Sequence, residues 1–170
     1  MLIDCLGNGC HGNQMVFYSD SNFNPEMSIG YLVRRTHQLG MGMLEPVFAA
    51  EGLTSIQWLA LASINPHGAS SCAAIARDMA YDKGATTRVA DTLEERGWIT
   101  RQRDGDDRRV VQLVLTPAGT SVMLRVREML VAQWNAWLKD WNDKDIMDLI
   151  RLLQRLRDTL AHAAEEGAAA

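Results

Sequence analysis

Apolar residues recur at intervals of three and four positions along most of this chain, and this period predicts a mainly helical fold. Glycines and Pro46 interrupt the first expected helix and are expected to weaken or bend it. The last two expected helices carry long apolar stripes. The helices are expected over residues 27–50, 55–64, 71–79, 83–96, 117–141 and 143–163, followed by a fraying tail at residues 164–170.

Side chains that can cap a helix stand where most of these helices begin. Thr54 and Gln57 form a capping box, in which each side chain accepts a hydrogen bond from the backbone amide of the other residue. Gly97 is expected to end the helix that begins near residue 83. Single capping residues are expected at Ser71, at Asp82, at Thr116 before Pro117, and at Asn142.

Two short stretches break the helical period and are rich in strand-forming residues. Trp98–Arg103 and Val110–Leu115 are predicted strands, and the Asp104–Gly105 turn between them leads to two arginines. Together with the two short helices before them, these strands predict a winged helix-turn-helix over residues 54–116. The expected fold class is mainly α with a small β-hairpin.

The helix expected over residues 83–96 has a polar face that can enter a major groove. Ala85, Val89 and Leu93 are expected to face the core, with Lys83 and Arg88 on the opposite side. Thr and Arg side chains can read base edges or hold phosphates, and both roles stay open at this point. The candidate DNA contacts are Lys83, Thr86, Thr87, Arg88 and Thr92 on the helix, and Arg108 and Arg109 in the wing.

An ordered set of short motifs resembles the MarR family of transcriptional regulators. The motifs are Leu53-Thr54-x-x-Gln57-Trp58, Ile75-Ala76, Thr87-Arg88-x-x-x-x-Leu93-x-x-x-Gly97-Trp98-Ile99-x-Arg101, Asp107-Arg108-Arg109 and Leu115-Thr116-x-x-Gly119. Their order and spacing carry the resemblance, which covers about residues 28–162. It implies a homodimeric repressor that binds double-stranded DNA at a pseudo-palindromic operator and is released by a small ligand.

The resemblance also implies roles outside the helix that reads DNA. An acid–arginine pair, here Asp82 and Arg109, would hold the wing at a fixed angle to that helix, with Asp107 beside the pair. The first long helix would be shared between the dimer interface and a ligand pocket. Some relatives sense peroxide through a cysteine near the start of this helix, and Gly30 occupies that position here, which argues against this chemistry.

A ligand pocket is expected between the first long helix and the winged domain. Tyr31, Arg34, His37 and Met41 stand at helical spacing, and with Trp58 they would form an apolar slot with a cation. Such a slot suits a small aromatic or phenolic acid. Core packing and surface charge explain each of these residues equally well when it is taken alone.

The helices after Pro117 carry more apolar surface than a small winged domain can bury, and a homodimer would cover it. Residues 27–53 and 117–163 are therefore expected to form a helical dimerisation region. Residues 1–26 are expected to form an N-terminal arm that is partly disordered or packed on the partner subunit. The expected interface residues are Trp134, Trp137, Leu149, Leu153 and Leu156.

The charge balance leaves the partner of the winged helix open. The chain has 17 Lys and Arg against 21 Asp and Glu, and its winged region carries equal numbers of both. Such a balance weakens non-specific attraction to nucleic acid. A winged helix that contacts other proteins, without a ligand response, is therefore the alternative function. An enzyme is disfavoured because no paired-carboxylate, Cys–His or phosphate-loop motif is present.

The three cysteines do not predict a disulfide framework or a metal centre. They lack regular spacing, and Cys5, Cys10 and His11 do not complete a closed site, while Cys72 stands far away. No metal or cofactor is therefore expected. No signal peptide and no membrane-spanning stretch is recognised, so the expected location is cytoplasmic, with no membrane partner.

Overall fold

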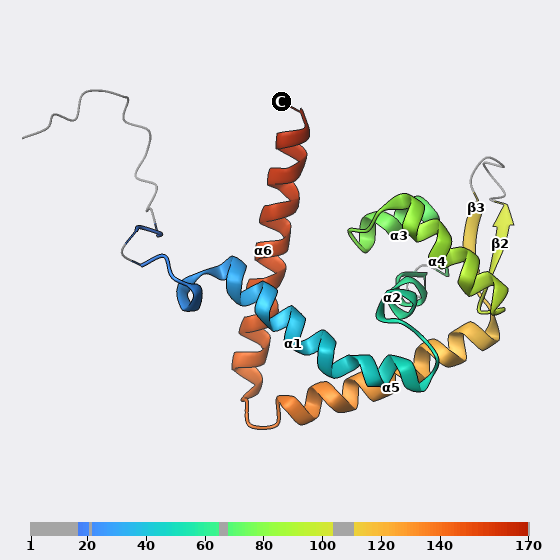
Figure 1. Cartoon of the computed structure of the whole chain (residues 1–170), viewed down its shortest axis with the longest axis horizontal. Coiled ribbons are helices and arrows are strands. Elements are labelled where there is room, and N and C mark those ends of the chain that lie inside the picture. Colours follow the sequence, from blue (N-terminus) through green and yellow to red (C-terminus); the bar gives the residue numbers. More distant parts are fainter. Residues whose placement is uncertain (1–16, 21, 65–67, 104–110, 170) are drawn as a thin grey trace, which may run out of the picture. The chain divides into compact units, whose positions relative to one another are not determined.

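The computed structural model describes residues 17–20, 22–64, 68–103 and 111–169, and Figure 1 shows the order of their helices and strands. The chain divides into two compact units, residues 1–43 and 44–170, which we treat separately. The elements are the 3-10 helix η1 Pro25–Met27, the helices α1 Ile29–Ala50, α2 Ser55–Ile64, α3 Cys72–Asp78, α4 Lys83–Glu95, α5 Pro117–Trp137 and α6 Asp143–Ala169, and the strands β1 Ala69–Ser71, β2 Ile99–Arg103 and β3 Val111–Leu115.

In the first unit, a small aromatic cluster leads into α1. The Tyr18 ring packs edge-on against Phe17 and Phe23, with centroids 5.0 and 5.2 Å away. Its hydroxyl donates to the Met27 carbonyl and accepts from the Ile29 amide. The helix therefore begins at Ile29, two residues later than expected. Glycines and Pro46 were expected to interrupt it, but α1 is assigned as one continuous helix.

The second unit has a core made by the winged region together with α5. Helix α2 packs against α3, α4, α5 and strands β1 and β3, and α3 packs against α4. The fully buried side chains come from α2, α3, α4, both long strands and α5; they include Leu61, Ile64, Ile75, Leu93, Ile99, Leu113, Met123 and Val126. The expected mainly helical winged fold is confirmed.

The sheet has three antiparallel strands in the order β1-β3-β2, so the expected two-stranded hairpin was incomplete. Strand β2 pairs with β3 from Ile99 opposite Leu115 to Arg103 opposite Val111. Strand β1, which the sequence did not indicate, pairs with the other side of β3. It joins the start of α3 to the sheet.

The capping interactions fix the starts of the helices and agree with the expectations. The Thr54 amide donates to Gln57 Oε1 at 2.9 Å, and the Gln57 amide donates to Thr54 Oγ1 at 3.3 Å. Ser71, Asp82 and Thr116 each accept a hydrogen bond from the amide three residues later. Asn142 does the same for Asp145 at the start of α6.

The start of α5 lies unusually close to the turn between α4 and β2. The Thr116 amide donates to the Trp98 carbonyl, and the Thr116 hydroxyl donates to the Gly97 carbonyl at 2.7 Å. A Cβ atom at Gly119 would lie only 1.9 Å from the Trp98 carbonyl oxygen. Only glycine fits at this crossing without moving the backbone.

The C-terminal helices bury little within one chain. The buried residues of α5 lie between Gly119 and Leu130, and no described residue of α6 is buried. Helix α5 ends at Trp137, not near residue 141, and α6 continues to Ala169, so the tail expected to fray is helical. Alanine, the strongest helix former, is frequent there.

Within the part of the chain that is described, no single helix has the length and apolar composition to cross a membrane. Helices α1 and α2 satisfy both requirements only when they are taken together as a bent pair.

Candidate nucleic-acid interface

Helix α4 presents a polar face to solvent along its whole length. Lys83, Thr87 and Arg88 are exposed, and Asp82 caps the helix by accepting from the Ala85 amide at 2.8 Å. The side chains of Lys83 and Arg88 form no hydrogen bond or ion pair with another described residue. Their charges are therefore available to a partner outside the chain.

The threonines of α4 are more constrained than the sequence suggested. Thr87 Oγ1 donates to the Lys83 carbonyl at 3.0 Å, and Thr92 Oγ1 donates to the Arg88 carbonyl at 3.1 Å. Each hydroxyl keeps its acceptor capacity, because its proton is used inside the helix. Thr92 is half-buried, so Thr87 is the more accessible of the two.

Thr86 was expected at the DNA surface, and this expectation is wrong. Its side chain is only 1% exposed, and its hydroxyl donates to the Asp82 carbonyl at 2.8 Å. The buried face of α4 consists of Thr86, Ala90 and Leu93, with Val89 half-buried beside them. The internal hydrogen bond satisfies the hydroxyl and lets this polar residue lie in the core.

Arg101 on β2 joins the wing strand to α4, and sequence reasoning assigned it no role. One guanidinium nitrogen donates to Asp91 Oδ1 at 2.6 Å, and another donates to Glu94 Oε2. The Arg101 backbone amide also donates to Glu94 Oε1 at 3.3 Å. The hydrogen bond with Asp91 is the largest contribution that raises the pKa of Arg101 above its ordinary value. Three bonds thus hold the strand against the exposed side of the helix.

The expected wing contacts lie outside the described residues. Asp107, Arg108 and Arg109 fall in residues 104–110, so the proposed pairing of Asp82 with Arg109 remains a prediction. The described parts of the wing are the paired segments Ile99–Arg103 and Val111–Leu115.

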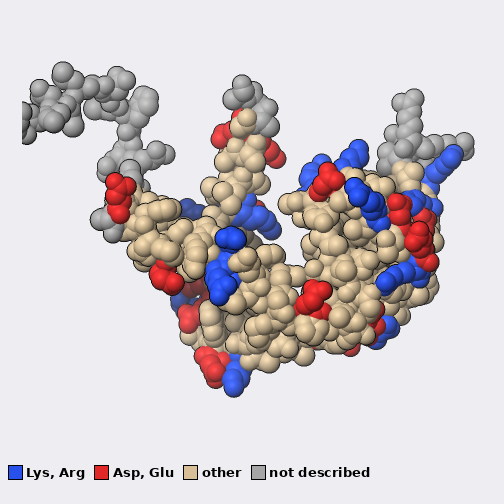
Figure 2. Space-filling model, in the orientation of Figure 1, with Lys and Arg blue, Asp and Glu red and all other residues tan. Residues whose placement is uncertain are grey.

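Basic side chains gather along the edge of the winged region that carries α3 and α4, and acidic side chains lie among them (Figure 2). On α4, the acids Asp91 and Glu94 are paired with Arg101. Pairing removes much of their repulsion toward a polyanion at short range. The net negative charge of the chain therefore does not prevent Lys83 and Arg88 on α4 from meeting a polyanion locally.

The expected ligand-pocket residues are divided between the two units. Tyr31, Arg34 and His37 are exposed on α1, and Met41 is half-buried. Trp58 lies in the second unit, where its ring is 6.0 Å from that of Phe48 and its Nε1 donates to the Met123 carbonyl at 3.4 Å. Trp58 therefore takes part in core packing, whichever further role it has.

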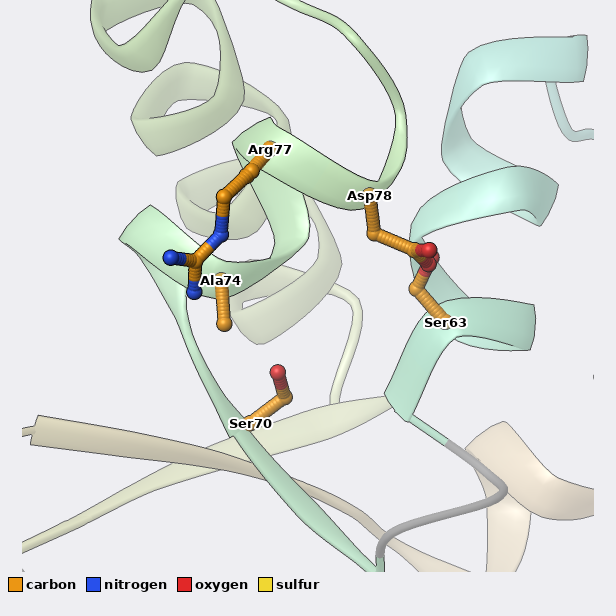
Figure 3. Close-up of a pocket in the computed structure, with 5 residues that line it drawn as sticks. All are labelled: Ser63, Ser70, Ala74, Arg77 and Asp78. Carbon is orange, nitrogen blue, oxygen red and sulfur yellow. The ribbon is translucent and has the colours of Figure 1, made fainter. Parts of the chain in front are cut away.

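A pocket that the sequence did not indicate lies between α2, β1 and α3 (Figure 3). Its volume is about 320 Å³, and it is lined by Ser63, Ser70, Ala74, Arg77 and Asp78. None of the residues expected to line a ligand site contributes to it. No group of three His, Cys, Asp or Glu side chains that could hold a metal ion occurs in the described ranges, and Cys5, Cys10 and His11 lie outside them.

The expected interface residues are largely uncovered in the single chain. Trp134, Leu149 and Leu153 are 44%, 42% and 46% exposed, while Trp137 and Leu156 are half-buried. The rings of Trp134 and Trp137 pack edge-on at 5.0 Å. Large apolar side chains are thus exposed on both α5 and α6. Monomeric proteins rarely expose so much contiguous apolar surface.

Comparison with known proteins places the winged region in a sequence family. A model of the MarR family matches residues 53–111. The transcriptional repressor MdtR of Bacillus subtilis is 33% identical over 93 residues, which cover 53% of this chain and 60% of that protein. The multiple antibiotic resistance protein MarR of Salmonella typhimurium is 30% identical over 100 residues, 59% of this chain and 69% of that protein. The chain thus spans about three fifths to two thirds of these curated relatives.

A solved structure extends the similarity to most of the chain. It is that of BpsR from Bordetella bronchiseptica, whose DNA binding is regulated by 6-hydroxynicotinic acid. The two chains superpose with a TM-score of 0.71 at 22% identity, covering 80% of this chain and 97% of the other. At this identity the likeness establishes the fold.

Proposed function

Because this chain belongs to the MarR family of transcriptional regulators, we propose that it is a sequence-specific DNA-binding repressor. The observation that carries the proposal is the exposed face of α4, where Lys83, Thr87 and Arg88 stand on a helix whose other face is buried. A helix that follows a shorter helix and a turn, with its polar face exposed, can lie in a major groove. The protein acts as a regulator, not as an enzyme, in the cytoplasm.

Arg101 acts as a positioning residue in this proposal. It pairs with Asp91 and Glu94, so β2 and α4 move as one body. The wing residues Arg108 and Arg109 would then meet the DNA at a fixed angle to α4, with Asp82 and Asp107 orienting them. We expect Arg109→Ala to weaken operator binding with little change in melting temperature.

We further propose a homodimer that binds a pseudo-palindromic operator. Residues 27–53 and 117–163 form its dimerisation region, and residues 54–116 form the DNA-binding domain. The support is the uncovered apolar surface of α6 and of the end of α5, where no described residue of α6 is buried. Two copies bring two α4 helices to successive major grooves, as a two-fold operator requires.

The proposed effector is a small aromatic or phenolic acid. Tyr31, Arg34, His37 and Met41 stand at helical spacing on α1, and these residues and Trp58 are the proposed effector contacts. Support comes from BpsR, whose DNA binding is regulated by 6-hydroxynicotinic acid, an aromatic carboxylic acid. An effector that releases DNA must bind the free protein more tightly than the DNA-bound form.

The test measures binding of the full-length protein to DNA upstream of its own gene over a series of salt concentrations. Lys83→Ala and Arg88→Ala should each weaken binding by about 5- to 100-fold, the usual range for a good base contact. A loss at a phosphate contact should also reduce the salt slope by about one. Arg127→Ala on α5 is the matched control, because Arg127 is exposed and unpaired among the described residues. Equal binding by all four proteins would favour a winged helix that contacts proteins.

A further inference from the structure

The pocket between α2, β1 and α3 contains two hydrogen-bond donors that no described residue satisfies. Figure 3 shows the Arg77 guanidinium folded back above Ala74, with the Ser70 hydroxyl pointing toward the same space. Neither the guanidinium nor the hydroxyl forms a hydrogen bond or ion pair with another described side chain or carbonyl. Both groups therefore face the cavity with free donors.

The acid in the same pocket is already engaged. Asp78 accepts a hydrogen bond from the Ser63 hydroxyl across the gap between α3 and α2, and it forms no ion pair with Arg77. An Arg and an Asp on consecutive residues of a helix point in different directions, which keeps the two charges apart. Asp78 keeps its negative charge, but its carboxylate points toward Ser63 and away from the Arg77 guanidinium, which therefore remains unpaired among the described residues (Figure 3).

The direction of the Arg77 side chain brings its charge to the pocket. Side chains of an α-helix lean toward the start of that helix. The Arg77 guanidinium accordingly lies toward the start of α3 and toward β1 (Figure 3). Arg77 is exposed, so its charge is accessible from solvent.

We propose that this pocket binds a small oxyanion, such as phosphate or a short carboxylate, through the Arg77 guanidinium and the Ser70 hydroxyl. The planar fork of arginine matches the oxygens of either group. The cavity of about 320 Å³ lies at the small end of ligand sites, and among the described residues its wall has Ala74 as an apolar surface and no aromatic ring. The occupant is therefore smaller and more polar than the aromatic effector proposed for α1. The two sites have no residue in common.

The test titrates sodium phosphate, and separately sodium acetate, into full-length protein while chloride holds the ionic strength constant. Backbone amide chemical shifts near residues 70–78 should change and saturate. Arg77→Gln should weaken phosphate binding at least about 10-fold, because a charge-assisted pair is lost. Arg77→Lys should restore only part of it, because the fork geometry is lost. Arg127→Gln should leave binding unchanged.

Three results would overturn the proposal. Shifts that do not saturate, or that survive Arg77→Gln, would show that no specific anion site exists. Reduced operator affinity with a smaller salt slope in Arg77→Gln, without saturable phosphate binding, would make Arg77 a contact to the DNA backbone. The proposed function is judged separately, since phosphate binding requires neither an operator nor the α1 effector. A protein that binds phosphate but not DNA would refute only the regulator.

Discussion

The winged region and the C-terminal helices use their apolar residues in opposite ways. The winged region and the first part of α5 enclose a common core, in which Leu61, Ile75, Leu93 and Leu113 are at most 1% exposed. Helix α6 has an apolar stripe as regular as any helix in the chain, yet none of its described residues is buried. The apolar residues of the first region are buried within one chain, whereas those of α6 stay exposed unless another molecular surface covers them.

This difference assigns folding stability to the first region and association with another molecule to the second. Burying a large apolar side chain contributes about 1.5–3 kcal/mol relative to leaving it exposed. The winged region gains this stabilisation within one chain, whereas α6 and the end of α5 can gain it only in a complex. A change in one region should consequently affect folding, and a change in the other should affect oligomeric state.

The largest effect is expected from Leu153→Asp, which tests the uncovered half of this comparison. Leu153 is 46% exposed in the single chain, and the dimer would bury it twice. An unpaired buried charge usually costs several kcal/mol, so dimerisation should weaken by at least about 100-fold. Sedimentation velocity at micromolar concentration measures it. Gln154→Asp, one position away on an exposed side, is the control, and a wild-type monomer would contradict the proposed dimer.

Gly119→Ala tests the self-contained half. A Cβ atom would meet the Trp98 carbonyl oxygen at 1.9 Å, so the start of α5 or the turn after α4 must move. Overpacking of this kind typically costs about 1–3 kcal/mol. Thermal unfolding should show a clear loss of stability with dimerisation kept. Gly167→Ala, where nothing lies near the added atom, should be neutral or slightly stabilising. An unchanged melting temperature for Gly119→Ala would disprove the tight crossing.

Arg101→Ala sharpens the comparison, because it alters the exposed face that is proposed to bind DNA and leaves the core of the winged region intact. Partly exposed ion pairs stabilise a protein by about 1 kcal/mol or less, so the melting temperature should change little. Operator affinity should fall by about 10-fold, because the wing is released and two acids on α4 repel the phosphates. Asp91→Asn combined with Glu94→Gln in the same variant should recover part of the loss. If these two substitutions restored no operator affinity, the whole loss would be due to the position of the wing.

The smallest effect concerns the pair of Glu51 with Arg125, which joins the loop before α2 to α5. The Arg125 guanidinium donates to both carboxylate oxygens at 2.7–3.1 Å, and these hydrogen bonds lower the pKa of Glu51 below its ordinary value of 4.5. A lowered folded-state pKa contributes stability above pH 4.5, which is lost as the pH falls through the folded value. A carboxyl-detected titration should show the low pKa. Arg125→Gln should return it toward 4.5, whereas Arg127→Gln should not.

Local chemistry predicted much of the fold from the sequence. Thr54, Ser71, Asp82 and Thr116 all cap the helices that follow them, because capping depends on residues only three positions apart. Strand β1 could not be predicted in this way. Its residues, Ala69–Ser71, have little strand preference and are held by pairing with β3, which is distant in the sequence.

The candidate site was predicted less completely, and the reasons are equally physical. Thr86 was assigned to the surface because it is polar, yet its spacing with Ala90 and Leu93 matches a helix period, and its hydroxyl is satisfied internally. Arg101 was part of the recognised motif, but its two acidic partners on α4 emerge only when β2 folds back along the helix. The pocket at Arg77 required three elements to come together.

The crossing at Gly119 has a mechanical consequence. Hydrogen bonds from the Thr116 amide and hydroxyl, and the absence of a side chain at Gly119, hold the first turn of α5 on the turn between α4 and β2. Helix α5 then runs without a break for 21 residues to Trp137. A stiff rod clamped at one end cannot absorb a rotation applied at the other. In the proposed dimer, a tilt imposed near Trp134 would therefore be passed on, as torque, to α4 and the wing strands.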